Sequence, residues 1–302
     1  MRYKKTFSAL AALMLLLSCS GSSTGNNKAL LWKISGNGLE KPSYLFGTHH
    51  LVPLSFLDSI PGVHEAFGNT EQTVGELDMS NMTEMQMKIM GSAMMPVDVT
   101  YESLLPAGDV ALLDSTLTDL MGFGLEQFGR LKPAMLSNII SVTLYQRYYP
   151  SLAASENLDQ YFQEEALKRS RPVAGLETTE DQIYVLLEMQ TTERQAEMLR
   201  CMVKHPEMLK EQMDRLQAAY HAQDLDALWS LYTEETPDDP CPSTEEEKKA
   251  LNSDRNTRWL EKLPTIMAER SSFIAVGCLH LPGEEGLISG LRDQGYTVEA
   301  VR

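Results

Sequence analysis

The stretch SYLFGTHHLVP, residues 43–53, decides the fold, because it joins a predicted strand to a pair of histidines. Its apolar first half predicts a buried strand that ends at Gly47. His49 and His50 follow at the carboxyl end of that strand. Imidazoles change charge near neutral pH and bind metals, so their position at the end of a buried strand suggests a functional site.

A second stretch near the end of the chain, IAVGCLHLPG at residues 274–283, repeats the pattern of apolar strand, glycine, two residues and His-Leu. Aligning the two glycines places His50 on His280 and His49 on Leu279. A leucine can thus fill the place of His49, whereas His50 has a histidine as its counterpart. We therefore expect His50, rather than His49, to carry chemistry together with His280.

Strand patterns cluster near both ends of the chain and at two places in between. Apolar alternation and turn residues predict strands within residues 28–52, 71–80, 172–177, 271–277 and 296–302. Three- and four-residue apolar spacing predicts helices at 111–123, 157–170, 179–220, 224–235, 243–251, 255–270 and 284–294. This order predicts an α/β fold, with α+β as the alternative, in which N- and C-terminal strands build a central mixed β-sheet with a large helical insertion. No low-complexity linker interrupts residues 28–302, so we expect a single domain there.

The first residues have the pattern of a secretion signal. Positive charges precede a short apolar run from Ala9 to Leu17, which is too short for a comfortable membrane span. The run ends in Leu-Leu-Ser-Cys, which resembles the lipobox of bacterial lipoproteins. We therefore expect a signal peptide at residues 1–18, lipidation of Cys19, and a polar tether over residues 19–27. Ordinary signal cleavage beside an incidental cysteine is the alternative.

These expectations place the mature chain in the bacterial cell envelope, lipid-anchored and extracytoplasmic, at the outer membrane or in the periplasm. Removal of Arg2, Lys4 and Lys5 changes the formal net charge from −16 to −19. A chain this acidic, without a basic stripe, is unsuited to nucleic acid, so the lipid anchor is the expected contact with the membrane.

Three cysteines remain after Cys19, and in an oxidising compartment two of them could pair. Cys201 lies in a helical run and Cys241 lies in the loop TPDDPCP, so we favour a disulfide between these two. Pairings that involve Cys278 stay open, because spacing alone does not determine connectivity.

Acidic residues end two of the central predicted strands and could join the histidines at one edge of the sheet. These residues are Glu76 and Glu177. Two imidazoles and a carboxylate make a three-ligand metal site with positions left for water and substrate, so we predict a divalent metal held by His50, Glu76 and His280. A second carboxylate could act as the general base, for which Glu177 is the candidate. Purely structural histidines and a solvated Glu76 are the alternatives.

Arg255 and Asn256 begin a predicted helix within SDRNTRW. In a functional interpretation both point into the site, where the arginine polarises a substrate carbonyl or orients a ligand; a solvated helix end is the alternative. Other catalytic motifs fail. His64 opens a zincin-like HEAFG, but Gly68 stands where the second histidine is required, and neither a Gly-x-Ser-x-Gly elbow nor a P-loop occurs.

Seven of the 17 methionines lie between Met79 and Met95. Their three- and four-residue spacing predicts a helix whose apolar face covers something, most simply by packing. An adaptable apolar lip for a peptide-like ligand and a copper site are the alternatives.

Five segments together resemble the TraB/GumN family, which is related to the Tiki metalloproteases and more remotely to the erythromycin-esterase and ChaN-like proteins. The segments are LLWKISGNGLEKPSYLFGTHHL, VGELD, GLETTEDQ, RNTRW and FIAVGCLHLPGEEGLISGLRDQGYTV, and the resemblance spans residues 30–301. The resemblance implies two Gly-x-x-His motifs with an intervening glutamate, which correspond to His50, His280 and Glu76. Cys278 departs from the small residue that is usual at its position.

The resemblance also implicates Glu177, Arg255 and Asn256, and it implies a divalent-metal-dependent hydrolase, with manganese or cobalt favoured and zinc as the alternative. Two hypotheses follow. The first is a membrane-anchored hydrolase that cleaves amide bonds of peptides with metal-activated water. The second is a non-catalytic lipoprotein that binds a peptide, another small molecule or a cofactor in the same cleft. Only the first predicts metal-dependent turnover that is lost when Glu76 or Glu177 becomes glutamine.

Overall fold

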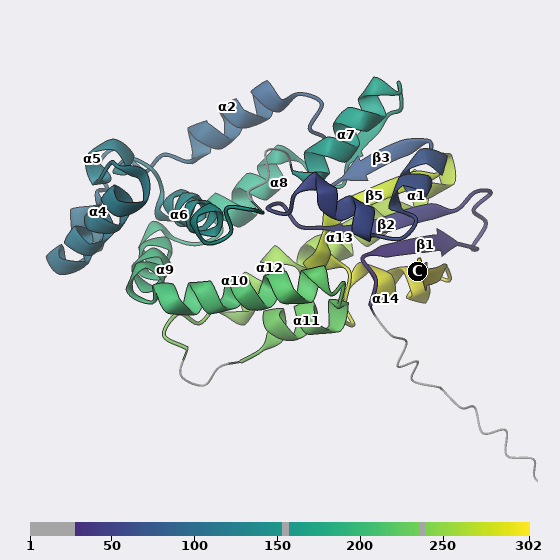
Figure 1. The fold of residues 1–302 in the computed structure, drawn as a ribbon. Coiled ribbons are helices and arrows are strands. Elements are labelled where there is room, and N and C mark those ends of the chain that lie inside the picture. Colours follow the sequence, from purple (N-terminus) through teal and green to yellow (C-terminus); the bar gives the residue numbers. More distant parts are fainter. Residues whose placement is uncertain (1–27, 153–156, 236–238) are drawn as a thin grey trace, which may run out of the picture.

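The computed structural model describes residues 28–152, 157–235 and 239–302 (Figure 1). The predicted signal peptide, the lipidated cysteine and the tether lie outside these residues. Among the helices of the described part, none is long and apolar enough to cross a membrane.

Within the described residues, six strands form one mixed sheet in the order β4-β3-β5-β2-β1-β6. They are β1 (Leu31–Ser35), β2 (Ser43–Thr48), β3 (Gln72–Gly75), β4 (Val173–Gly175), β5 (Ser272–Gly277) and β6 (Thr297–Ala300). β2, β5, β3 and β4 are parallel to one another, whereas β1 is antiparallel to both β2 and β6. The predicted α/β class with a central mixed sheet is confirmed, and four strands end at the same edge of it.

Helices fill the connections, most of them between β3 and β5. They are α1 (Val63–Asn69), α2 (Met82–Ser92), α3 (Tyr101–Leu104), α4 (Ala107–Met121), α5 (Leu125–Phe128), α6 (Pro133–Tyr148), α7 (Leu158–Lys168), α8 (Thr179–Ile183), α9 (Thr192–Lys204), α10 (Pro206–His221), α11 (Leu225–Thr233), α12 (Glu245–Leu251), α13 (Ser253–Glu269) and α14 (Leu287–Asp293). A π-helical turn, Tyr184–Glu188, continues α8, and short 3₁₀ turns cover Leu54–Ser59 and Cys278–His280. Pro206 separates α9 from α10, because a proline lacks the N–H that a helix interior needs.

The apolar residues form two separate clusters. One surrounds the sheet and includes Phe46, Phe162 and Phe273, with the rings of Phe162 and Phe273 4.6 Å apart between centroids. The other joins the helices of the insertion through residues such as Leu113 and Leu136. Figure 1 shows the two parts side by side, with α4, α5, α6 and α9 away from the sheet. The helical insertion therefore has a core of its own.

The methionine-rich segment forms the helix that its spacing predicts, α2, but only part of its apolar surface is packed, since Met82 and Ile89 are half-buried. Met85 is its one buried residue in the described structure, whereas Met87 and Met90 are 65% and 54% exposed. The helix instead lies against α8, to which Lys88 connects it through an ion pair with Glu180 at 2.9 Å. Met87 and Met90 are thus left in solvent, whereas Met85 is packed.

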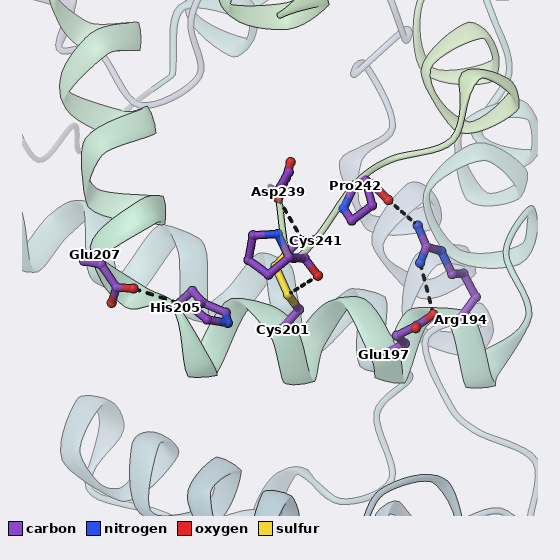
Figure 2. Close-up of a disulfide and its surroundings, with 9 residues drawn as sticks. Arg194, Glu197, Cys201, His205, Glu207, Asp239, Cys241 and Pro242 are labelled. Carbon is purple, nitrogen blue, oxygen red and sulfur yellow. Dashed lines mark hydrogen bonds and ion pairs between the residues drawn. A yellow bond between two sulfur atoms is a disulfide. The ribbon is translucent and has the colours of Figure 1, made fainter. Parts of the chain in front are cut away.

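Cys201 of α9 forms a disulfide with Cys241, the pairing that the sequence favours (Figure 2). The Cα atoms of the two residues are 5.7 Å apart, and the bond closes a loop of 40 residues. It connects the loop after α11 to the helical insertion. Arg194, also on α9, donates a hydrogen bond to the Pro242 carbonyl at 2.7 Å and supports the same contact. The third cysteine of the described residues, Cys278, is buried and unpaired.

Replacing both bridged cysteines, Cys201→Ser with Cys241→Ser, should lower the free energy of unfolding by about 2–4 kcal/mol, because the open loop regains conformational freedom in the unfolded chain. Urea denaturation followed by circular dichroism measures this difference. Dithiothreitol should shift the wild-type midpoint toward that of the double variant and leave the variant itself unchanged. Equal midpoints for the two oxidised proteins would contradict a stabilising role.

Candidate active site

The carboxyl ends of the four parallel strands bring the predicted site residues to one edge of the sheet. His50 lies two residues after β2, Glu76 directly follows β3, Glu177 lies two residues after β4, and His280 lies three residues after β5. A cleft of about 390 Å³ opens there. Its lining includes Thr48, His49, His50, Leu51, Glu76, Gln182, Val185, Leu186, Leu216, Arg255, Gly277, Cys278, Leu279 and His280. Open α/β sheets bind their ligands at this edge.

The glycines of both motifs are needed because other groups approach the backbone closely. The Gly277 N–H donates a hydrogen bond to Glu76 Oε1 at 2.8 Å, and a Cβ atom at that position would lie 3.2 Å from the same oxygen. A Cβ atom on Gly47 would lie 3.0 Å from the Cα atom of Cys278. The two motifs are staggered in the sheet, since Thr48 rather than Gly47 is the partner of Gly277.

His50 is held by a carboxylate that the sequence analysis missed. Its Nδ1 lies 2.7 Å from Oδ2 of Asp159, which is 4% exposed and also accepts a 2.7 Å hydrogen bond from the Thr48 hydroxyl. The Asp159 carboxylate raises the pKa of His50 to about 9. Asp159 therefore fixes the ring of His50 through Nδ1. The other ring nitrogen, Nε2, does not contact Asp159.

His280 is fixed in the same manner by a different helix. Its Nδ1 lies 2.7 Å from Oδ1 of Asn256, and its Nε2 lies 3.1 Å from Nη1 of Arg255. Because a guanidinium only donates hydrogen bonds, Nε2 of His280 accepts a hydrogen bond from Arg255. The ring proton is therefore on Nδ1, which donates a hydrogen bond to Oδ1 of Asn256. Burial lowers the pKa of His280 to about 4, so the ring is neutral near pH 7. The predicted importance of Asn256 thus has a structural counterpart, as the residue that orients His280.

Arg255 occupies the centre of the polar cluster. Its Nε and Nη2 atoms bind the two oxygens of Glu177 at 3.0 and 2.6 Å, and Nη2 also lies 2.5 Å from Oε2 of Glu76. Burial alone would disfavour the charge of Glu76, but His280 and Arg255 outweigh it and lower the pKa of Glu76 to about 2. A buried cation is thereby shared by two carboxylates.

Glu177 is less accessible than a general base would need to be. Its side chain is 2% exposed, both of its oxygens accept hydrogen bonds from Arg255, and it does not line the cleft. The geometry favours Glu177 as the residue that orients Arg255. Glu76, by contrast, lines the cleft and is joined there by the amide of Gln182, whose Nε2 lies 3.2 Å from Oε2.

The donor set fits a divalent cation in its chemistry but is closed around Arg255 in its arrangement. Both histidines have Nδ1 held by an oxygen, as metal-binding histidines usually do, which orients Nε2 as the ligand atom. At His50, whose pKa is about 9, a cation would also have to displace the proton of Nε2. Glu76 supplies an ionised carboxylate 3.8 Å from Nε2 of His280. Yet no group of three or more His, Cys, Asp or Glu side chains in the described part of the chain is arranged so that it could hold a metal ion. A cation could be bound only after the Arg255 guanidinium moves off Nε2 of His280.

The contacts of His49 indicate a packing role rather than a catalytic or metal-binding one. Its ring lies 5.2 and 6.1 Å from the rings of Tyr220 and Tyr145, and its Nδ1 accepts a hydrogen bond from the Leu51 N–H at 3.2 Å. Burial lowers the pKa of His49 to about 4, so it is neutral near pH 7. This environment agrees with the repeat, in which a leucine occupies the matching place.

Removing the central cation by Arg255→Leu should lower the free energy of unfolding by about 3–5 kcal/mol, because the buried carboxylates of Glu76 and Glu177 would lose the positive charge that they share. Arg147→Leu is the matched control, since Arg147 pairs with Asp119 at 2.5 Å but is 54% exposed. The control should change stability by less than about 1 kcal/mol. Urea denaturation compares the two variants, and similar losses for both would contradict the central role of Arg255.

Comparison with known proteins assigns the chain to one family. No curated protein and no solved structure matches it significantly. The sequence profile of the TraB/PrgY/gumN family, however, matches residues 30–300, which include all the strands of the described structure and the whole cleft. The chain therefore belongs to the TraB/PrgY/gumN family.

Proposed function

We propose that the protein is a divalent-metal-dependent hydrolase that acts on peptides. The observation that carries the proposal is the matched support of the two histidines. Asp159 and Asn256 each lie 2.7 Å from an Nδ1 atom, and the two rings stand beside an ionised carboxylate in one cleft. Histidines that serve only packing, as His49 does, have no need of this paired support.

Each side chain of the site would have a role that follows from its contacts. His50, Glu76 and His280 would hold the cation, which when bound supplies a water of lowered pKa as the nucleophile. Arg255 lines the cleft, and once a bound cation takes its place on Glu76 and His280, the N–H groups released from these partners would stabilise negative charge on a substrate carbonyl oxygen. Glu177 keeps the guanidinium in place through its two hydrogen bonds. Asn256 acts on His280 rather than on substrate.

The cellular setting of the proposal follows from the first residues of the chain. A cleaved signal peptide and a lipid on Cys19 would place the domain in the cell envelope, held at a membrane by the tether of residues 19–27. The Cys201–Cys241 disulfide supports an oxidising compartment, because such bonds persist outside the cytoplasm.

A second candidate is a non-catalytic lipoprotein that binds a peptide or cofactor in this cleft. The closure of Glu76 and His280 around Arg255 favours it, because a site that is already neutralised by its own cation has no need of a metal. The two functions differ in metal content and in turnover.

Metal content tests the ligand set directly. Wild-type protein purified without chelators or a histidine tag and loaded with manganese, cobalt or zinc should hold about one equivalent by mass spectrometry of the metal. His50→Ala and His280→Ala should both lose it while remaining folded by circular dichroism. His64→Ala is the matched control. The side chain of His64 is 58% exposed and contacts a carboxylate, and the side chain of His50 is 60% exposed and also contacts one. Wild-type protein without metal under every condition would exclude the proposal.

Turnover separates the hydrolase from the binding protein. Cleavage of a random peptide library, read by mass spectrometry, should fall at least about 100-fold in Glu76→Gln, because the substitution removes the ionised carboxylate of the cleft. Glu177→Gln should lose about 10–100-fold, since Arg255 is then held less firmly. A wild-type protein that binds library peptides without metal-dependent cleavage supports the non-catalytic candidate.

A further inference from the structure

We propose that the cleft selects peptides with a large apolar side chain beside the bond that is cleaved, and that Leu186 is the main residue of this selection. The inference rests on the proposed hydrolase function and names the substrate class of the same site. It comes from the lining of the cleft, which combines the polar cluster, here called the polar end, with a set of aliphatic side chains, here called the apolar wall.

The apolar wall stands next to the polar cluster within a single cavity. Its aliphatic side chains come from four separate segments of the chain and are Leu51, Val185, Leu186, Leu216 and Leu279. The cavity volume of about 390 Å³ lies within the range of pockets for small ligands, about 300–1,000 Å³. A folded partner or a second copy of the chain cannot enter a space of this size. An extended segment with a polar group next to an apolar side chain can.

Leu186 is exposed in a way that a leucine of the core is not. It is 50% exposed although it lines the cleft, whereas its neighbour Val185 is 8% exposed. Single exposed leucines are common on protein surfaces and need no explanation by themselves. This one lies in the same cavity as His50 and Arg255, so its exposed surface faces the space that a substrate would fill.

The backbone around Leu186 adds an independent observation. The turn Tyr184–Glu188 is π-helical, with the Met189 N–H bound to the Tyr184 carbonyl at 2.7 Å. Such turns are rare and occur frequently at functional sites. This one directly continues α8, whose Gln182 binds Glu76 at 3.2 Å. The same short segment therefore supplies Gln182 to the polar end of the cleft, and Val185 and Leu186 to the apolar wall.

Exposed apolar side chains also occur outside the cleft, on the segments next to Leu186. Tyr184 is 57% exposed, and α2, which packs against α8, carries the exposed Met87 and Met90. Methionine side chains adapt to apolar partners of varied shape.

The test compares wild type with Leu186→Asn on one random peptide library. Peptides retained by the protein and peptides cleaved by it are both identified by mass spectrometry. Leu167→Asn is the matched control, because Leu167 is a leucine of similar exposure, 47%, on α7 and does not line the cleft. Wild type should enrich Leu, Ile, Met or Phe at one position of the bound and the cleaved peptides. Leu186→Asn should lose about tenfold or more of that enrichment, and the control should retain it.

The two readouts keep this inference apart from the proposed function. Cleavage without any apolar preference, or a preference that survives Leu186→Asn, overturns the inference and leaves the hydrolase in place. Apolar peptides that are retained but not cleaved, and released by Leu186→Asn, support the apolar subsite and count against the hydrolase. A library that is neither retained nor cleaved with a preference also overturns the inference.

Discussion

The parallel alignment of β2, β5, β3 and β4 is the constraint on which the site depends. Parallel strands have their carboxyl ends at one edge, so residues far apart in sequence, such as His50 and His280, meet there. The close packing of the strand ends then restricts the residue types that can stand there. Glycine suits position 277 because the Glu76 carboxylate that accepts its N–H lies so close that a Cβ atom would stand only 3.2 Å from Oε1.

Charge balance at this edge is achieved by Arg255 rather than by solvent. Two carboxylates and a neutral imidazole surround the guanidinium, and the cleft side of the cluster is formed by Glu76 and His280. A buried charge is tolerated only with such partners. A cation that binds Glu76 and His280 competes with Arg255 for Oε2 of Glu76 and Nε2 of His280. The ion pairs of the metal-free site therefore weaken its affinity for metal.

The sequence was sufficient for the sheet and for the motif residues, because strand periodicity and the repeat of Gly-x-x-His are local patterns. It also favoured the cysteines that pair, from their placement in a helix and a loop. Asp159 was missed, since an aspartate near the start of an amphipathic helix looks like any solvated residue until the fold places it beside His50. The exposure of α2 was missed for the same reason. Methionine spacing predicts a face but does not determine what lies against it.

The two residues that orient the histidines are themselves positioned by the core. Asp159 precedes Phe162 by three residues on α7, and Asn256 precedes Trp259 by three on α13. Residues three apart lie on the same side of a helix, and both aromatic side chains are fully buried. Packing of each aromatic ring therefore sets the rotation of its helix and, with it, the direction of the oxygen that holds an imidazole. Apolar contacts of α7 and α13 therefore position the polar residues of the site.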